Sequence, residues 1–185
     1  VYEREDRIGG LLMYGIPNMK LDKSVIARRQ KLMEEEGIVF KTGVNVGGKK
    51  SVPRLMRDFY AVVLCCGAKQ PRPLAAEGIE GTEGVYFAVD FLKAATRNVL
   101  GIETLPEKFN AKDRDVVIVG GGDTGNDCIG TVIRMGCKSV TALEMLPKPP
   151  AERMPNNPWP EWPKTLRTDY GHQEAIEVFG ADLRI

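Results

Sequence analysis

The chain has 185 residues, which is enough for one large domain or two small ones with a buried apolar core. Its 26 Lys and Arg residues offset 25 Asp and Glu residues, so no chain-wide field attracts nucleic acid or an acidic membrane surface. No apolar run approaches the ~20 residues that cross a bilayer, and no signal-peptide pattern opens the chain. We therefore expect a soluble, cytoplasmic protein without nucleic-acid or membrane partners.

The first 42 residues combine strand and helix patterns. Residues 1–3 and 38–42 are typical of short strands. Between them, residues 24–36 predict a helix, with Ser24 as its N-cap and Gly37 as its stop. The chain begins without an initiator methionine and within a strand pattern, so we expect it to be a piece of a longer protein.

The next segment predicts a turn, a helix and a buried strand. Residues 47–50, Gly-Gly-Lys-Lys, are typical of an exposed hairpin turn, and residues 52–57 of a short helix. The apolar run 61–66 predicts a strand that is covered on both faces. Glycine and proline crowd residues 69–84, as they do in a connection between units.

The cysteines predict neither a metal site nor a disulfide scaffold. Cys65, Cys66, Cys128 and Cys137 lack the C-x-x-C spacing of metal ligands and the density of secreted disulfide proteins. Adjacent cysteines in a strand point to opposite faces, so a disulfide between Cys65 and Cys66 would be strained. We interpret this pair as small core residues of a reduced protein.

The second half of the chain has the pattern of parallel βαβ units. Residues 85–101 predict a strand that passes into an amphipathic helix. The later elements are a strand at 115–119, a helix at about 123–135, a strand at 139–145, a proline-rich loop, and a helix with the start of another strand within 170–185. The sequence therefore predicts an α/β fold of Rossmann-like parallel units.

The strand at 115–119 runs into the pattern Gly120-x-Gly122-x-x-Gly125, and a helix pattern leaves it. In a dinucleotide-binding turn, the first glycine permits the turn, the second admits the pyrophosphate, and the third lets helix and strand pack closely. The helix N-terminus then offers free N–H groups to the phosphates, and Thr124 is a further donor. The alternative is a glycine-rich turn in an α/β domain that binds no nucleotide.

Glu144 lies at the end of the next strand, about 20 residues beyond the last glycine, where an acid can bind the ribose 2′-hydroxyl. An acid at this position favours NADH. Lys148 and Arg153 follow closely and could instead pair with the 2′-phosphate of NADPH. Both cofactors therefore stay open at this point.

A second nucleotide signature is half present at the start of the chain. Glu3 closes the first strand pattern, and Gly9-Gly10 follows it, as in the second strand of another dinucleotide-binding domain. The strand predicted at 61–66 ends in Gly67-Ala68 and would approach the same ligand. An ordinary surface glutamate is the alternative interpretation of Glu3.

Several segments together resemble one family. They are YEREDRIGGLLMYGIPNMKLDK, VVLCCGAKQPRPL, FAVDFLKAAT, VVIVGGGDTGNDCIGTVIRMGCKSV, LEMLPKPPAERMPNNPWPEWP and TDYGHQEA. They closely resemble the small (beta) subunit of NADPH-dependent glutamate synthase, a flavoprotein with two dinucleotide-binding domains. The pairing of GGGDTGNDC with NPWPEWP and TDYGHQEA is the most specific part of this resemblance.

The resemblance implies a function and a division into domains. In that family, a hydride passes from NADPH to FAD, and electrons pass through iron–sulfur clusters to a large (alpha) subunit that makes glutamate. The resemblance implies a partial FAD-binding domain at 1–84, a connecting segment at 85–111 and an NAD(P)H-binding domain at 112–185. It also implies two sets of contacts: with FAD, Glu3, Gly9, Gly10, Leu11, Gly67 and Ala68; with the nicotinamide nucleotide, Gly120, Gly122, Thr124, Gly125, Asn126, Glu144, Lys148 and Arg153.

The chain also departs from the family. The cysteine-rich cluster domain, the first FAD glycine loop and the C-terminal return to the FAD domain are not in this sequence. We therefore expect the isolated chain to bind FAD poorly and to lack turnover, with iron–sulfur clusters only in the full-length protein. Two other classes stay open: a nucleotide-binding or assembly module without turnover, and a related FAD-dependent reductase of the pyrimidine-reducing or ferredoxin-linked kind.

Three further side chains suggest chemistry. His172 is the only histidine, and we favour a surface or loop-ordering role over a general base, since hydride transfer depends on position and orientation. We therefore predict no catalytic residue. Trp159 and Trp162 could stack on a nucleotide base, but we favour anchoring of the long loop to the domain.

Overall fold

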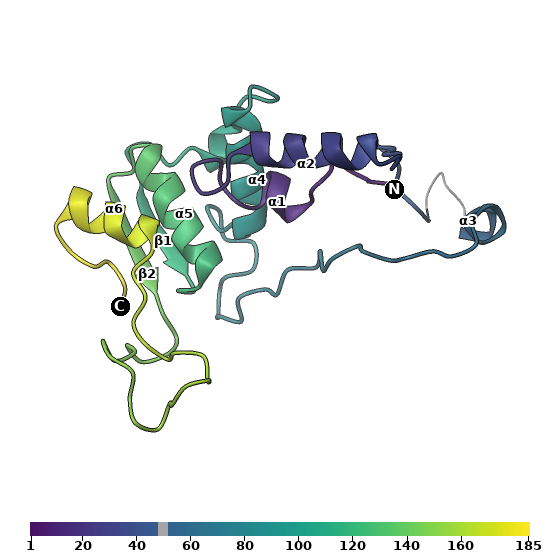
Figure 1. Ribbon diagram of the computed structural model, residues 1–185. Coiled ribbons are helices and arrows are strands. Elements are labelled where there is room, and N and C mark those ends of the chain that lie inside the picture. The colour runs from purple at the N-terminus through teal and green to yellow at the C-terminus, as the bar shows by residue number, and fades with distance from the viewer. Residues whose placement is uncertain (48–51) are drawn as a thin grey trace. The chain divides into compact units, whose positions relative to one another are not determined.

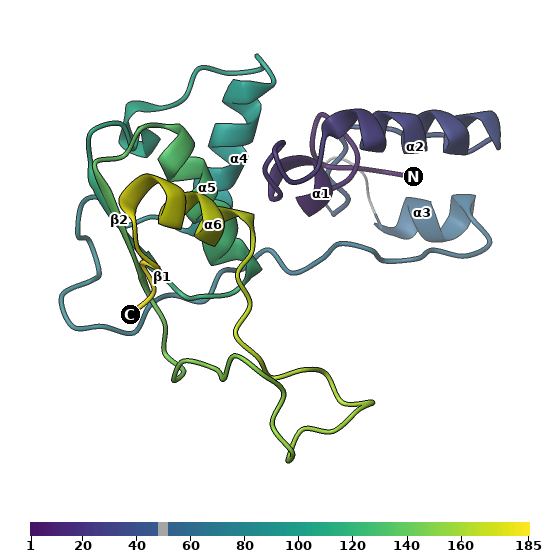
Figure 2. The ribbon, with the colours of Figure 1, turned by 60° about the vertical axis from the view of Figure 1, so that its left-hand side comes forward.

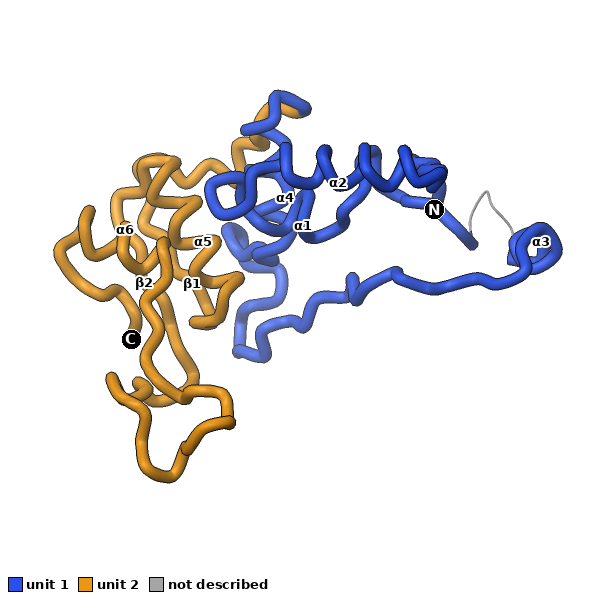
Figure 3. Tube along the Cα trace, viewed as in Figure 1, with its two compact units in different colours: residues 1–102 blue, residues 103–185 orange. Residues whose placement is uncertain are grey.

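The computed structural model describes residues 1–47 and 52–185 of the chain. The chain forms two compact units, Val1–Ile102 and Glu103–Ile185 (Figure 3). The hairpin turn predicted at 47–50 falls almost wholly outside the described residues. The assignment of cofactor domains to residues 1–84, 85–111 and 112–185 stays a prediction.

The second unit is built on a parallel sheet (Figure 1). Strand β1 (Asp115–Val119) pairs in parallel with β2 (Ser139–Leu143), as predicted. A third stretch of chain pairs with β2: the Ala142 N–H donates to the Leu183 carbonyl, and the Ile185 N–H donates to the Ala142 carbonyl, each at 2.9 Å. Strand β1 therefore lies on one side of β2, and residues 183–185 lie on the other. This is the strand order of one half of a Rossmann fold.

Helices α5 (Asp123–Arg134) and α6 (Tyr170–Phe179) lie side by side (Figures 1 and 2), and α5 packs on both strands. Apolar residues recur on one side of α5 at helical spacing and meet the sheet there. The buried core of this unit includes Ile129, Val132, Val140, Ala142 and Ala175. A short 3₁₀ turn, Glu107–Phe109, precedes β1.

The other face of the sheet is open to solvent. Side chains alternate between the faces of a strand, so Val117 and Val119 point away from α5. They are 63% and 57% exposed, and Leu143 on β2 is 39% exposed. One face of this sheet is therefore apolar and uncovered.

Helices are the main regular elements among the described residues of the first unit. It contains α1 (Leu11–Tyr14), α2 (Lys23–Glu35), α3 (Val52–Asp58) and α4 (Ala88–Val99). Its small core forms around Met13, Tyr14 and Ile26. The helices predicted at 24–36, at 52–57 and within 85–101 are confirmed.

The ends of these elements differ from the predictions. Asp22, not Ser24, caps α2, because the Asp22 carboxylate accepts a hydrogen bond from the Ser24 N–H at 2.8 Å. The strand patterns at 1–3 and 38–42 form only a parallel bridge, between Tyr2 and Lys41. Both patterns are therefore extended and paired, but over a short length.

The strand predicted at 61–66 is wrong. Residues 59–87 are irregular apart from turns, and Val63 and Leu64 are 82% and 78% exposed. Cys65 and Cys66 are exposed as well, so their interpretation as core residues is also wrong. A strand covered on both faces needs neighbouring strands to pair with its N–H and C=O groups, and the described residues of this unit form no strand that could do so.

A buried lysine fixes the segment between α1 and α2. The Lys23 ammonium donates to the carbonyl groups of Leu12, Ile16 and Leu21 at 3.0, 2.6 and 3.0 Å. Buried carbonyl groups need donors, and a single cation serves three of them here. Lys23 therefore holds this part of the chain in one conformation.

We expect Lys23→Met to lower the free energy of unfolding by about 2 kcal/mol, because a hydrogen bond to a charged group contributes about this much. Urea unfolding followed by circular dichroism measures the loss. Lys31→Met is the matched control, since Lys31 lies on the same helix with its side chain 78% exposed. An equal loss in both variants would contradict the role assigned to Lys23.

Candidate nucleotide-binding site

The glycine turn joins β1 to α5 at the carboxyl end of the sheet. Gly120 has a φ of +110°, a backbone conformation that favours glycine. Its N–H still donates to the Leu143 carbonyl at 2.9 Å, so the chain leaves the sheet directly after this residue. The turn therefore begins where the two strands end.

Gly122 and Gly125 serve different purposes in the turn. A Cβ on Gly125 would collide with the Gly120 carbonyl oxygen, whereas a Cβ on Gly122 would meet no atom within 4 Å. Gly125 thus lets α5 touch the end of β1, and Gly122 leaves open space at the N-terminus of α5. Gly122 is the N-cap and offers no capping side chain, so the first N–H groups of the helix have no partner within it. Such a helix end can bind an anion.

The other residues predicted for this turn divide into two groups. Thr124 lies exposed in the first turn of α5, beside the open space at Gly122. Asn126 lies one residue beyond Gly125 and is only 1% exposed. Its side-chain oxygen accepts a hydrogen bond from the His172 N–H at 3.1 Å, so this side chain faces α6 and not the turn.

Glu144 follows β2 and lies against the glycine turn. Its Oε1 atom accepts hydrogen bonds from the N–H groups of Met145 at 2.8 Å and Leu146 at 3.3 Å. A Cβ on Gly121 would collide with Oε2 of the same carboxylate. The structure therefore holds a carboxylate beside the turn, where the sequence predicted an acid for the ribose.

Lys148 and Arg153 lie in the long loop after β2, and both are exposed. Arg153 donates to the Asn157 carbonyl at 3.1 Å. The Asn157 side chain in turn accepts from the Lys164 N–H at 2.8 Å and donates to the Trp162 carbonyl at 3.1 Å. Arg153 is therefore tied to the loop itself.

Asn157, not the tryptophans, organises this loop. Asn157 is buried, while Trp159 and Trp162 are 84% and 71% exposed. The guanidinium group of Arg167 lies over the Trp162 ring, with its Cζ atom 4.3 Å from the ring centroid. The anchoring role predicted for the two tryptophans is therefore wrong.

Helices α5 and α6 are joined by polar side chains next to the turn. The Tyr170 hydroxyl donates to the Asp127 carboxylate at 2.8 Å. Burial, together with this carboxylate, raises the pKa of Tyr170 well above its usual value, so the hydroxyl keeps its proton. A Cβ on Gly171 would lie 2.8 Å from the Asn126 side-chain oxygen and 3.0 Å from the Gly130 nitrogen. Only glycine lets the two helices approach this closely.

His172 is buried in the first turn of α6 and is not a surface residue. It forms a capping box with Asp169, and its Nδ1 atom accepts from the Asp169 N–H at 3.3 Å. The proton of the neutral ring therefore lies on Nε2, which has no hydrogen-bond partner among the described residues. Burial, and then the charge of Arg184, lower the pKa of His172.

The residues predicted to contact FAD lie in the first unit. The Glu3 carboxylate accepts a hydrogen bond from the Glu5 N–H at 2.9 Å, and the Lys69 ammonium lies 3.9 Å from the Glu5 carboxylate. The stretch that follows Gly67-Ala68 is therefore close to the stretch that contains Glu3. Leu11 is exposed at the start of α1.

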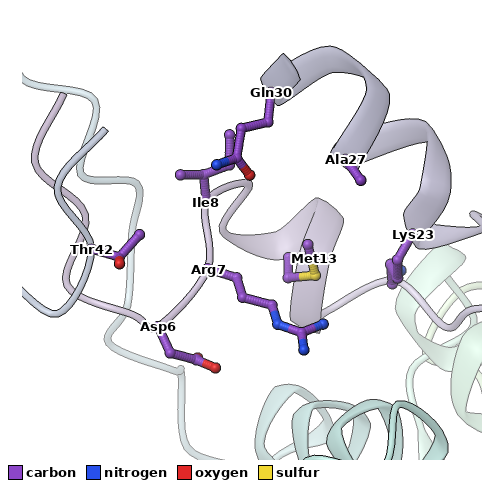
Figure 4. A pocket seen from close by; sticks show the side chains of 8 residues that line it. All are labelled: Asp6, Arg7, Ile8, Met13, Lys23, Ala27, Gln30 and Thr42. Atoms are coloured by element: carbon purple, nitrogen blue, oxygen red, sulfur yellow. The ribbon is translucent and has the colours of Figure 1, made fainter. Parts of the chain in front are cut away.

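A cavity of about 360 Å³ lies beside these residues (Figure 4). Asp6, Arg7 and Ile8, which precede Gly9-Gly10, line one side, and Lys23 and Gln30 of α2 line another. Figure 4 shows the Arg7 side chain extending across this space. None of the predicted FAD residues lines this cavity, although Gly9 directly follows Ile8 in the chain.

Reasoning from the sequence missed Gly121, Asp127, Tyr170 and Gly171. The motifs GGGDTGNDC and TDYGHQEA that contain them stood out as a pair, and that pairing could have indicated a contact between two helices.

Among residues 1–47 and 52–185, no cluster of His, Cys, Asp and Glu side chains is suited to hold a metal ion. No helix within the same described ranges has the length and apolar character needed to span a bilayer.

Comparisons with known proteins agree with this geometry. Residues 49–159 match the family described as pyridine nucleotide-disulphide oxidoreductase. The chain is 49% identical to the glutamate synthase (NADH) of Schizosaccharomyces pombe over 187 residues, covering 100% of this chain and 9% of that protein. It is 44% identical to the small chain of glutamate synthase (NADPH) of Bacillus subtilis, covering 100% and 37%. A mutant of FprA from Mycobacterium tuberculosis has a similar structure, with a TM-score of 0.61 and 21% identity over 77% of this chain and 35% of that one.

The glycine turn, the parallel sheet and the strand order define an α/β unit of the Rossmann type. The chain belongs to the pyridine nucleotide-disulphide oxidoreductase family. It spans little more than a third of the length of the bacterial small chain and less than a tenth of the fungal protein. The predicted α/β fold is therefore confirmed, and the family of the chain agrees with the predicted oxidoreductase class.

The buried histidine predicts a pH dependence. An unfolded histidine has its ordinary pKa of 6.5, and the folded state lowers this pKa, so acid protonates the unfolded state first. The free energy of unfolding should therefore fall as the pH drops below 6.5, and this fall should end once the pH is below the lowered pKa of the folded state. His172→Gln keeps a capping side chain at this position and removes the titration. Urea unfolding of both proteins between pH 8 and pH 5 should show a steeper loss for the wild type, and parallel curves would contradict the prediction.

Proposed function

We propose that this chain binds NADH or NADPH at the glycine turn and contributes that site to a glutamate synthase of the small-chain type. In the complete protein, a nucleotide held at this turn would supply a hydride for FAD. The family of this chain and the names of its relatives support the proposal. The isolated 185 residues carry the nucleotide-binding part of this function.

One observation carries the proposal. Open space at Gly122 faces the N-terminus of α5, and the Glu144 carboxylate lies against the same turn. A pyrophosphate needs N–H donors without an obstructing side chain, and a ribose needs an acceptor for its hydroxyl groups. Both requirements are met within one turn of chain.

The chemistry assigned to this chain is binding and orientation. A bound pyridine nucleotide supplies the hydride itself. The first N–H groups of α5 and the Thr124 hydroxyl hold the pyrophosphate, and Glu144 accepts a hydrogen bond from the ribose. No side chain needs to act as an acid or a base, because hydride transfer depends on distance and orientation.

The FAD contacts and the partner belong to the same proposal. Glu3, Gly9, Gly10, Leu11, Gly67 and Ala68 are this chain's share of the FAD site in the complete protein. In the complete protein, iron–sulfur clusters would carry the electrons on to a large (alpha) chain that forms glutamate. The name "small chain" of the bacterial relative supports a separate large chain. A cytoplasmic location is part of the same proposal.

Replacing Gly122 with valine tests the binding site. Gly122 has extended backbone angles that any residue adopts, and a Cβ there meets nothing, so Gly122→Val should still fold, with only the modest loss of stability expected for valine at an N-cap. The valine fills the space of the pyrophosphate, and titration calorimetry should show at least a ~tenfold weaker affinity for NADH and NADPH. Gly125→Ala is the contrasting variant, because its Cβ meets the Gly120 backbone and lowers stability. Unchanged binding by Gly122→Val would refute the proposed site.

Replacing Glu144 tests the choice of cofactor. Glu144→Gln keeps the acceptor oxygen and removes the negative charge that repels a 2′-phosphate. The ratio of NADPH affinity to NADH affinity should rise by about fivefold, as expected for removing one partly exposed charge. Glu152→Gln, in the exposed loop, is the control and should leave the ratio unchanged. An unchanged ratio in Glu144→Gln would contradict the proposed contact between this carboxylate and the ribose.

A further inference from the structure

Two polar side chains that directly follow the glycine turn in the sequence form hydrogen bonds with α6. Asn126 accepts a hydrogen bond from the His172 N–H at 3.1 Å, and Asp127 accepts one from the Tyr170 hydroxyl at 2.8 Å. Both α5 residues are buried, and they follow Gly125 in the chain without a gap. The polar contact with α6 therefore begins one residue after the turn.

Helix α5 is held on two sides at this point. On the sheet side, the missing Cβ of Gly125 lets the helix touch the Gly120 carbonyl. On the α6 side, Gly171 packs against Asn126 and Gly130 with no room for a Cβ. The position of the first turn of α5 therefore depends on the sheet and on α6 together.

The chemistry of this contact favours a role in positioning. The Nδ2 atom of Asn126 has no hydrogen-bond partner among the described residues, although this side chain is 1% exposed. A buried donor without a partner is destabilising, and an apolar side chain would avoid that loss. Directed hydrogen bonds fix the register of two helices in a way that apolar contacts do not.

The opposite end of α5 provides an internal comparison. Arg134, the last residue of α5, pairs with Glu174 of α6 at 2.5 and 3.2 Å. This ion pair joins the same two helices, but it lies at the end of α5 that is opposite the glycine turn. It can therefore stabilise the helix pair without setting the position of the turn.

We propose that α6 positions the glycine turn through Tyr170, Asp127 and Asn126, so that nucleotide affinity depends on side chains that do not touch the nucleotide. This inference rests on the proposed function. Helix-end N–H groups bind a pyrophosphate only when they point at it, and a misplacement of about 1 Å is enough to weaken such a site strongly. Tyr170, Asp127 and Asn126 are positioning residues.

The test compares Tyr170→Phe with Glu174→Gln in the whole chain. Tyr170→Phe removes one hydroxyl near the turn, and Glu174→Gln weakens the ion pair at the far end. Titration calorimetry with NADH gives the affinity, thermal unfolding gives the stability, and amide hydrogen exchange of residues 120–125 without nucleotide reports the turn itself. Asp127→Asn keeps an acceptor oxygen for Tyr170 and serves as the conservative variant.

We expect Tyr170→Phe to weaken NADH binding by about fivefold, within the range for residues that couple to a site without contacting its ligand. Amide exchange at 120–125 should become faster in the same variant. Glu174→Gln should lower the melting temperature but leave the affinity and the exchange of the turn unchanged. Asp127→Asn should stay close to the wild type.

Two outcomes would overturn the inference. Equal affinity in Tyr170→Phe and the wild type would do so, and so would affinity losses that merely follow the melting temperature in both variants. The wild type separates this failure from that of the proposed function. If the folded wild type binds no nucleotide, both the proposed function and the positioning role fail. If the wild type binds and Tyr170→Phe binds equally well, only the positioning role is refuted.

Discussion

The contact between Gly125 and the carbonyl group of Gly120 is the constraint on which the second unit depends. It brings the start of α5 onto the end of β1, and the helix then lies along the sheet. A parallel strand must return through such a crossover, so β2 begins where α5 ends and finishes beside the turn. The same contact therefore sets the fold of the unit and the place of Glu144.

The two units differ in how far their structure follows from the sequence. In the second unit, the predicted elements depend on local patterns: an apolar strand, glycines with special backbone geometry, and a helix with one apolar face. In the first unit, the run 61–66 has an equally apolar pattern but forms no strand. A strand depends on neighbours that a local pattern does not contain, and α2 shows the reverse case, because a helix makes its own hydrogen bonds.

The site follows the same rule. The spacing of Gly120, Gly122 and Gly125 describes one turn of backbone, and its geometry could be predicted from the residues themselves. The side chain of Asn126 belongs to the same motif, yet its partner lies 46 residues away on α6. His172 likewise caps α6 because it contacts Asp169 and is buried. Its spacing in the sequence does not reveal this burial. Spacing predicts what the backbone does, whereas contacts between distant helices decide what the side chains do.

The open face of the sheet gives the second unit the character of an amphiphile. Val117, Val119 and Leu143 place branched apolar groups in water, although parallel sheets are nearly always covered on both faces. Removing such a surface from water is favourable by about 25 cal/mol per Å², and excluded anions such as sulfate strengthen this tendency. Self-association through this face is therefore favoured by a high protein concentration and by excluded anions in the buffer.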